Sequence, residues 1–144
     1  MDPKLMKIVN KATDLHGHLG PFLVIGVRIG LIGIRELGLE KNEKLHVTVM
    51  LKNSVPFSCV IDGIQVTTKC TIGNKKIRLK RASGIAAKFE IPEGRQVTVE
   101  VSPTTFERLK NELLRESVSS DEVKRLAQTV ASLPEEELFI IRRT

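Results

Sequence analysis

Aromatic residues are scarce in this sequence, which contains no Trp, no Tyr and only five Phe in 144 residues. An aromatic platform that stacks nucleic-acid bases is therefore not expected. The hydrophobic core must instead be built from Ile, Leu, Val and Ala. Hydrophobic residues make up 41% and charged residues 28% of the chain, as in a single globular domain.

Cysteine is also scarce, and a long uncharged apolar run is lacking. Cys59 and Cys70 are the two cysteines. Residues 1–11 lack the apolar segment of a secretory signal, so we expect a cytoplasmic protein with reduced thiols that serve a metal or chemistry. The most apolar stretch, residues 21–38, carries three charged side chains. It falls short of a membrane span, and no membrane partner is expected.

Basic residues exceed acidic ones, which gives a formal net charge of +6 and permits an anionic partner. Residues 69–81, KCTIGNKKIRLKR, hold six basic residues and no acidic one. They could form a solvated strand edge, where lysines discourage pairing between sheets. They could also form a rim for a carboxylated or phosphorylated ligand, with Lys75, Lys76 and Arg78 attracting its charge. Nucleic-acid binding is a minor alternative, because no recognised motif accompanies the charge.

Two helices are predicted at the start of the chain. The first begins at Pro3 and ends at Gly17, and the second runs from Pro21 to about residue 37. The second helix carries Gly26, Gly30 and Gly33 on one face, and each glycine costs about 1 kcal/mol relative to alanine. Close approach of a sheet, a second subunit or a ligand would offset that cost.

Alternating apolar and polar residues predict strands at 44–52, 76–80, 85–91 and 95–101. A helix is predicted at 59–68, and further helices begin at Ser102 and Ser119. The tail at 135–144 fits either a short strand or a helical end. This order of elements indicates an α+β fold. We expect one domain, with a core at 1–102 and a helical extension at 103–144 packed on it.

The segment HGHLGP at 16–21 places two of the three histidines at the corner between the first two helices. Positions 16 and 18 of a continuous helix diverge by about 200°, so His16 and His18 can converge only if Gly17 breaks the helix. Cys59 falls in the first helical turn, where the helix dipole favours a thiolate. Asp62 lies three residues further on, on the same face.

Three interpretations of these residues remain open at this point. His16, His18, Cys59 and Cys70 could bind zinc or another transition metal. Cys59 could instead act as a reactive thiol without metal, with Asp62 beside it. The cysteines and histidines could also be purely structural.

Three segments together resemble the FmdE family, which takes its name from one of the subunits of formylmethanofuran dehydrogenase. They are LHGHLGPFLVIGVRIG at 15–30, CVIDGIQVTTKCTIGN at 59–74 and ASGIAAKFEI at 82–91. The resemblance implies a core of helix, strand and helix followed by three strands in a mixed sheet, with C-terminal helices. It also implies a metal, usually zinc, in a pocket between the His-x-His segment and the Cys-x-x-Asp helix. The matching positions are His16, His18, Cys59 and Cys70 for the metal, with Asp62 and Gln65 as polar neighbours.

The chain departs from the family pattern in two places. Many members have a cysteine shortly after the second histidine, where this chain has residues 19–21, LGP. Some members carry a C-terminal zinc finger, whereas residues 103–144 contain no cysteine. The named enzyme complex holds its molybdenum or tungsten pterin in other subunits, so the resemblance implies an accessory or stand-alone relative.

The leading hypothesis is a homodimer, formed through the glycine-rich helix, that binds a metal and a small anionic ligand. Cys59 and Asp62 would be the reactive groups, with Asp62 orienting the ligand or acting as a base. An open coordination position would give a hydrolytic or Lewis-acid site. The alternative is a non-catalytic protein that docks other subunits of a formylmethanofuran dehydrogenase-like complex.

Overall fold

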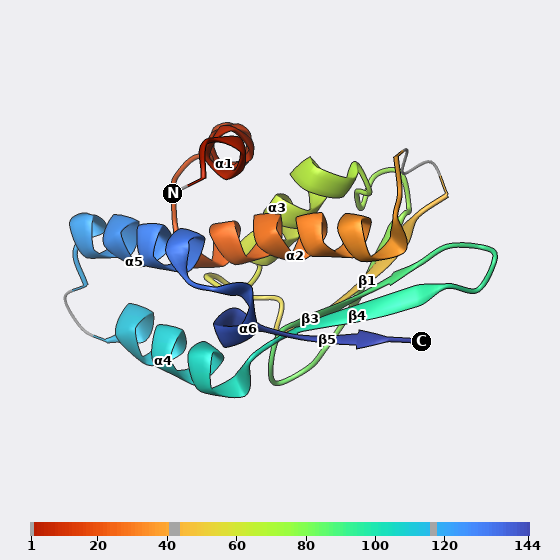
Figure 1. Ribbon diagram of the computed structural model, residues 1–144. Coiled ribbons are helices and arrows are strands. Elements are labelled where there is room, and N and C mark those ends of the chain that lie inside the picture. Colours follow the sequence, from red (N-terminus) through yellow and green to blue (C-terminus); the bar gives the residue numbers. More distant parts are fainter. Residues whose placement is uncertain (1, 41–43, 116–117) are drawn as a thin grey trace.

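The computed structural model describes residues 2–40, 44–115 and 118–144 (Figure 1). The first part of the chain forms two helices, a strand, a third helix and three more strands, as predicted, and two further helices follow the fourth strand. In chain order the elements are α1 (Pro3–His16), α2 (Pro21–Leu37), β1 (His46–Met50), α3 (Cys59–Thr68), β2 (Ile77–Lys80), β3 (Ala86–Glu90), β4 (Gln96–Val101), α4 (Pro103–Leu114), α5 (Ser120–Ser132), α6 (Glu135–Leu138) and β5 (Phe139–Arg143).

The five strands form one mixed sheet in the order β2-β1-β3-β4-β5. Strands β1 and β2 are parallel because α3 connects them as a crossover, and the other pairs are antiparallel. The α+β fold with a mixed sheet is thus confirmed. The tail left open by its sequence pattern is an edge strand, since β5 pairs antiparallel with β4 from Val97↔Arg143 to Val101↔Phe139. Residues 103–144 therefore contribute a strand as well as helices.

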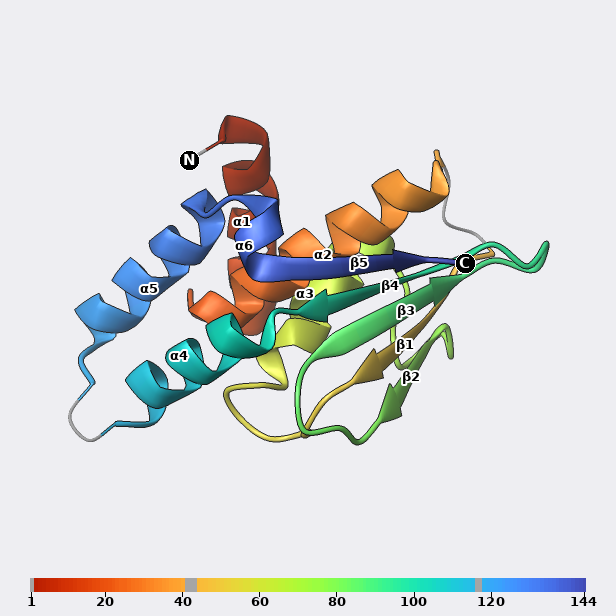
Figure 2. The same cartoon turned by 60° about the horizontal axis from the view of Figure 1, so that its bottom comes forward.

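Helices α1, α2 and α3 lie on one face of the sheet, with α2 and α3 between the sheet and α1, and α4 and α5 extend beyond one end of the strands (Figure 1). Burial alternates along the strands, so that Val47 and Val49 of β1 and Val97 and Val99 of β4 face the helices and are buried. The opposite face carries polar and half-exposed residues and is turned toward the viewer in Figure 2. Within the described part of the chain, no helix has both the length and the hydrophobicity needed to cross a membrane.

The glycine-rich face of α2 packs inside the same chain. A Cβ atom added to Gly26 would clash with the backbone carbonyl of Val60 in α3, and one added to Gly30 would clash with the Thr67 side chain. Gly33 lies against the Phe89 ring of β3 in the same way. The prediction that this helix forms a dimer interface is therefore wrong for its glycine face. Self-association remains a prediction and requires another surface.

The C-terminal segment is anchored on α2 by Arg28. Its Nη1 donates hydrogen bonds to the carbonyl oxygens of Val130 (2.8 Å) and Leu133 (2.7 Å) at the end of α5. The guanidinium carbon also lies 5.8 Å from the centre of the Phe139 ring at the start of β5. These contacts satisfy carbonyls that a helix end leaves free, and they hold α5 beside α2.

Candidate metal centre

Gly17 ends α1 in the left-handed conformation with φ 106° and turns the chain toward α2. The corner brings the rings of His16 and His18 together, with centroids 4.5 Å apart. The expected convergence of the two histidines is therefore found. The proline at position 21 then begins α2, as its fixed φ favours.

Both histidines line a cavity of about 310 Å³, and Cys59 at the start of α3 lines it too. The remaining wall is largely apolar and includes residues from α4 and from the segment that leads to α5. This contribution of the C-terminal extension was not predicted, although the apolar pair at 113–114 on a charged helix was a signal for it. The apolar wall residues are Pro21, Phe22, Leu23, Val55, Pro56, Leu113, Leu114, Val118 and Val123.

The carboxylate of Asp62 orients the imidazole ring of His16. The Nδ1 atom of His16 lies 2.6 Å from Oδ2 of Asp62. An ionised carboxylate only accepts hydrogen bonds, so Nδ1 is the donor in this contact, and the tautomer with its proton there has the lone pair on Nε2. Nε2 is buried and has no hydrogen-bond partner among the described residues. A buried acceptor left unpaired is costly, which marks this nitrogen as a place for a ligand.

Gln65 connects this pair to the loop after α3. Its Nε2 donates to Oδ1 of Asp62 (3.2 Å), and its Oε1 accepts from the backbone N–H of Ile72 (3.2 Å). Both ends of the amide are therefore used, and the orientation of Asp62 depends on the loop. The resemblance marked Gln65 as a polar position, but its bridging role was missed. The spacing of three residues from Asp62 on one helix was the available signal.

Cys59 is 7% exposed, and the pKa of its thiol differs from the prediction. Burial, and secondly the negative charge of Asp62, raise the pKa of Cys59 from its ordinary value of 9.0. The expected preference for a thiolate at the helix start is wrong for the metal-free protein. Loss of water and a nearby carboxylate outweigh the favourable backbone N–H groups.

Cys70 does not join the cavity. It follows α3, whose ten residues extend about 15 Å away from Cys59. Its side chain is fully buried, and its Sγ donates to the carbonyl oxygen of Leu45 (3.2 Å). Burial raises the pKa of this thiol as well. The structure therefore gives Cys70 a place in the core and does not bring it to His16 and His18.

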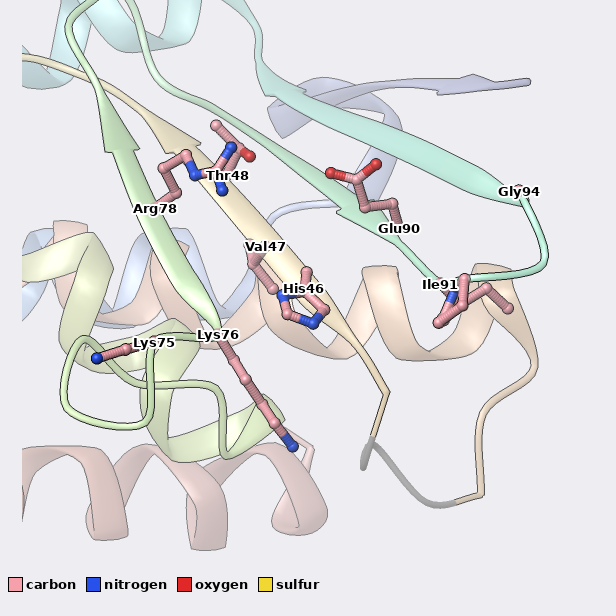
Figure 3. Close-up of a pocket in the computed structure, with 10 residues that line it drawn as sticks. His46, Val47, Thr48, Lys75, Lys76, Arg78, Glu90, Ile91 and Gly94 are labelled. Carbon is pink, nitrogen blue, oxygen red and sulfur yellow. The ribbon is translucent and has the colours of Figure 1, made fainter.

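Lys75, Lys76 and Arg78 also lie away from the two histidines. They line a separate cavity of about 360 Å³ together with His46 and Glu90, on the polar side of the sheet (Figure 3). The prediction that these cations attract a ligand toward Cys59 is thus not supported by their positions. In the sequence, Cys59 and Asp62 stand at the beginning of α3, whereas the three cations follow its end.

Over residues 2–40, 44–115 and 118–144, no three His, Cys, Asp or Glu side chains are grouped closely enough to hold one ion. The donors nevertheless fit a transition metal in their chemistry. A histidine that ligates zinc commonly donates its other ring N–H to a carboxylate, as His16 does to Asp62. Imidazole and thiol groups on one cavity are ligands that zinc prefers.

Comparison with known proteins identifies a sequence family, a related protein and a solved structure with a similar fold. The sequence model of the family described as "FmdE, Molybdenum formylmethanofuran dehydrogenase operon" matches residues 15–140. A curated relative from Archaeoglobus fulgidus, named a probable S-adenosyl-L-methionine-binding protein, is 27% identical over 158 aligned residues. The match covers 95% of this chain but only 42% of that protein, so the chain spans less than half of the relative's length.

A crystal structure of a tungsten formylmethanofuran dehydrogenase FmdE-like protein from Syntrophus aciditrophicus has a similar fold. The TM-score is 0.64 at 18% sequence identity, and the match covers 97% of this chain and 71% of that chain. At this identity the likeness concerns the fold. The family match crosses residue 102, so it includes most of the predicted core and most of the C-terminal extension.

Proposed function

The chain belongs to the FmdE family, and from this premise we propose that it binds a transition-metal ion, zinc first, at the cavity of His16, His18 and Cys59. One observation carries the proposal. The Nε2 atom of His16 is buried and unpaired within the described residues, and Asp62 fixes it as an acceptor from the other side of the ring. A metal ion or a hydrogen-bond donor would satisfy such an atom, and a carboxylate behind the ring is the arrangement typical of a metal ligand.

The roles follow from where each side chain lies. His16 offers Nε2, the exposed His18 ring offers a second nitrogen, and Cys59 offers Sγ from α3. Asp62 orients His16, and Gln65 orients Asp62. Three protein ligands leave one position open, and a bound ion would then serve as a Lewis acid for a ligand placed there.

The ligand we propose is a small molecule with an anionic group and an apolar body. Apart from the two histidines and Cys59, the cavity wall is mostly apolar, and Val55 and Leu114 at this wall are 80% and 56% exposed. The charge of the ligand would therefore be neutralised by the metal, since Lys75, Lys76 and Arg78 line another cavity. S-adenosyl-L-methionine, named for the archaeal relative, carries a carboxylate and is the first compound to test.

Metal analysis of the purified protein tests this function. We expect about one equivalent of zinc after reconstitution of the wild type, and loss of that equivalent in His16→Ala, His18→Ala and Cys59→Ser. His46→Ala and Cys70→Ser are matched controls, because they remove the same donor types outside the cavity. They should keep the metal. If reconstituted wild type holds none, or if the control variants lose it equally, the assignment is wrong.

A non-catalytic role as a docking subunit is the alternative within the same family. It predicts a closed metal site, whereas the proposed function predicts an ion that exchanges a solvent ligand. Cobalt substitution separates the two, because the absorption spectrum of cobalt responds to an added ligand such as cyanide only when a coordination position is open. A spectrum that does not respond would favour the docking role.

A further inference from the structure

We propose that the second cavity, lined by His46, Lys75, Lys76, Arg78 and Glu90, binds the phosphate group of a small, hydroxyl-bearing phosphorylated molecule. This site lies outside the His16 cavity and shares no lining residue with it. Phosphate binding here is therefore independent of the proposed metal centre.

Strand pairing places the polar groups of this cavity on one face of the sheet. Thr48 of β1 pairs with Arg78 of β2, and His46 of β1 pairs with Glu90 of β3. Neighbouring strands are about 4.8 Å apart and Thr48 and His46 are two residues apart along β1, so the backbones of Arg78 and Glu90 are separated by roughly 12 Å. Figure 3 shows the Arg78 side chain beside Thr48, with His46 between β2 and β3. A phosphate and one attached hydroxyl group fit between these side chains.

The loop that carries the two lysines is built around the Asn74 side chain. Its Oδ1 accepts from the backbone N–H groups of Thr71 (2.9 Å) and Lys76 (3.0 Å), and its Nδ2 donates to the carbonyl of Lys69 (2.8 Å). Lys75 adopts φ 64°, a left-handed conformation that is unfavourable for a residue with a side chain. The backbone at the cavity is thus held in place before any ligand binds, which lowers the cost of binding.

The lysine side chains supply the adjustable part of the site. Both extend away from His46 and Arg78 in Figure 3. Each has a flexible stem of four carbons, and the ammonium group of Lys75 can swing toward an anion above β2. The Arg78 guanidinium, by contrast, offers a planar pair of donors that suits two phosphate oxygens.

The balance of charge in the cavity favours phosphate over a single carboxylate. Among the described residues, three cations line it against one carboxylate, not counting His46. A phosphate monoester carries a charge of about −1.5 to −2 at neutral pH and a single carboxylate carries −1, so these cations attract the phosphate more strongly. Glu90 would repel a long polyanion but can accept a hydrogen bond from a hydroxyl group. No Phe of the described chain lines the cavity to stack a base, so the ligand is a phosphorylated polyol or sugar rather than a nucleic acid.

A titration followed by NMR chemical shifts tests the site, with ribose 5-phosphate, inorganic phosphate and ribose as probes. We expect both phosphates, but not ribose, to shift the amide signals of residues 46–48 and 75–78. Arg78→Met should weaken phosphate binding about tenfold or more, because a charge-assisted hydrogen bond is lost. His18→Ala should leave it unchanged, which separates this site from the metal centre.

Arg142→Met is the matched control for charge. Arg142 lies on β5, on the same polar face of the sheet, where it pairs with Thr98 of β4. In the order of the sheet, β5 is four strands away from β2, which carries Arg78. Loss of Arg142 should change phosphate binding less than twofold at moderate salt, since roughly 19 Å exceeds the screening length. An equal loss in both variants would show only a long-range effect of net charge, and shifts centred on His16 and His18 would place the anion elsewhere. Either result, or no shift at all, overturns the proposal.

Glu90→Gln tests the hydroxyl half of the ligand. Removal of a negative charge should tighten binding of inorganic phosphate several-fold. The advantage of ribose 5-phosphate over inorganic phosphate should shrink, because a neutral amide oxygen is a weaker acceptor than a carboxylate. If that advantage is unchanged in Glu90→Gln, Glu90 does not contact the ligand and the hydroxyl requirement is wrong.

Discussion

His16 and Asp62 are 46 residues apart in the sequence, yet Nδ1 of the imidazole lies 2.6 Å from the carboxylate. This contact joins the end of α1 to the first turn of α3 and leaves Nε2 facing away from Asp62. It has the form of the carboxylate–histidine pairs found behind metal ligands. The contact therefore gives the most direct test of how the proposed centre is organised.

Asp62→Asn should lower zinc affinity about 10- to 100-fold, as expected for loss of a carboxylate that orients a ligating histidine. The fold should remain, because the side chain is 31% exposed and an amide fills the same space. Zinc competition with a chromophoric chelator measures the change. Asp14→Asn removes an exposed carboxylate of α1 near the same corner and should keep wild-type affinity. Equal affinity in all three proteins would contradict the role of Asp62.

Gln65→Leu should affect both stability and metal binding. Two hydrogen bonds are lost, to Asp62 and to the N–H of Ile72, and we expect a decrease of about 1–2 kcal/mol in the free energy of unfolding. Zinc affinity should fall less than in Asp62→Asn, since Asp62 keeps its contact with His16. Gln65→Glu retains an acceptor for Ile72 but not the donor to Asp62. Compared with Gln65→Leu, this variant should therefore regain more of the free energy of unfolding than of the zinc affinity. If both are regained to the same extent, Gln65 does not position Asp62 for metal binding.

Alkylation of Cys59 tests the alternative in which this thiol acts without metal. Because burial and Asp62 raise its pKa above 9.0, iodoacetamide should modify it slowly at neutral pH in metal-free protein. The rate, followed by mass spectrometry in a Cys70→Ser background, should rise only in alkaline solution. Asp62→Asn should shift that rise to lower pH. Rapid modification of Cys59 at neutral pH would instead revive the thiol hypothesis.

The helix boundaries were predictable because their signals are local. Pro3 and Pro21 begin α1 and α2, and Gly17 and Gly38 end them in the left-handed conformation. The tail was not predictable in the same way. α6 passes directly into β5 at Phe139, and pairing with β4 rather than local preference makes the last residues a strand.

The candidate site could be predicted only in part. The convergence of His16 and His18 follows from one glycine, and its proximity to Cys59 was suggested by the family motif rather than by spacing. Cys70 was expected beside them and lies elsewhere, because nine of the ten residues between the two cysteines belong to α3 and separate them by the length of that helix. The environment of the Cys59 thiol is a property of packing, which no local pattern of residues discloses.

Gly26→Ala tests whether the glycine face of α2 serves packing within the chain. Alanine favours a helix by about 1 kcal/mol over glycine. Its Cβ would nevertheless clash with the backbone carbonyl of Val60, which cannot rotate away. We expect a net loss of about 1–3 kcal/mol in chemical denaturation. Gly84→Ala, where nothing lies within 4 Å of the added atom, should be close to neutral. A stabilised Gly26→Ala variant would show that α2 and α3 do not pack this closely.

The ion pair of Arg35 with Glu135 should make stability depend on pH in acid. Both guanidinium Nη atoms donate to the carboxylate, at 2.7 and 3.0 Å, and join α2 to α6. The hydrogen bond from Arg35, which outweighs the opposing effect of burial, lowers the pKa of Glu135 below its ordinary value of 4.5. A carboxyl group with a lowered pKa adds stability above its ordinary pKa, and that stability is lost as the pH falls through the lower value in the folded protein.

Arg35→Met should therefore be less stable than wild type at neutral pH, by no more than about 1 kcal/mol because the pair is partly exposed to solvent. The difference between the two proteins should shrink as the pH falls below 4.5, where Glu135 becomes protonated in both. Urea denaturation across this range measures it. Arg108→Met, on the exposed side of α4, controls for the change in net charge. A difference that stays constant into strong acid would mean that Arg35 stabilises the fold through the packing of its stem and not through Glu135.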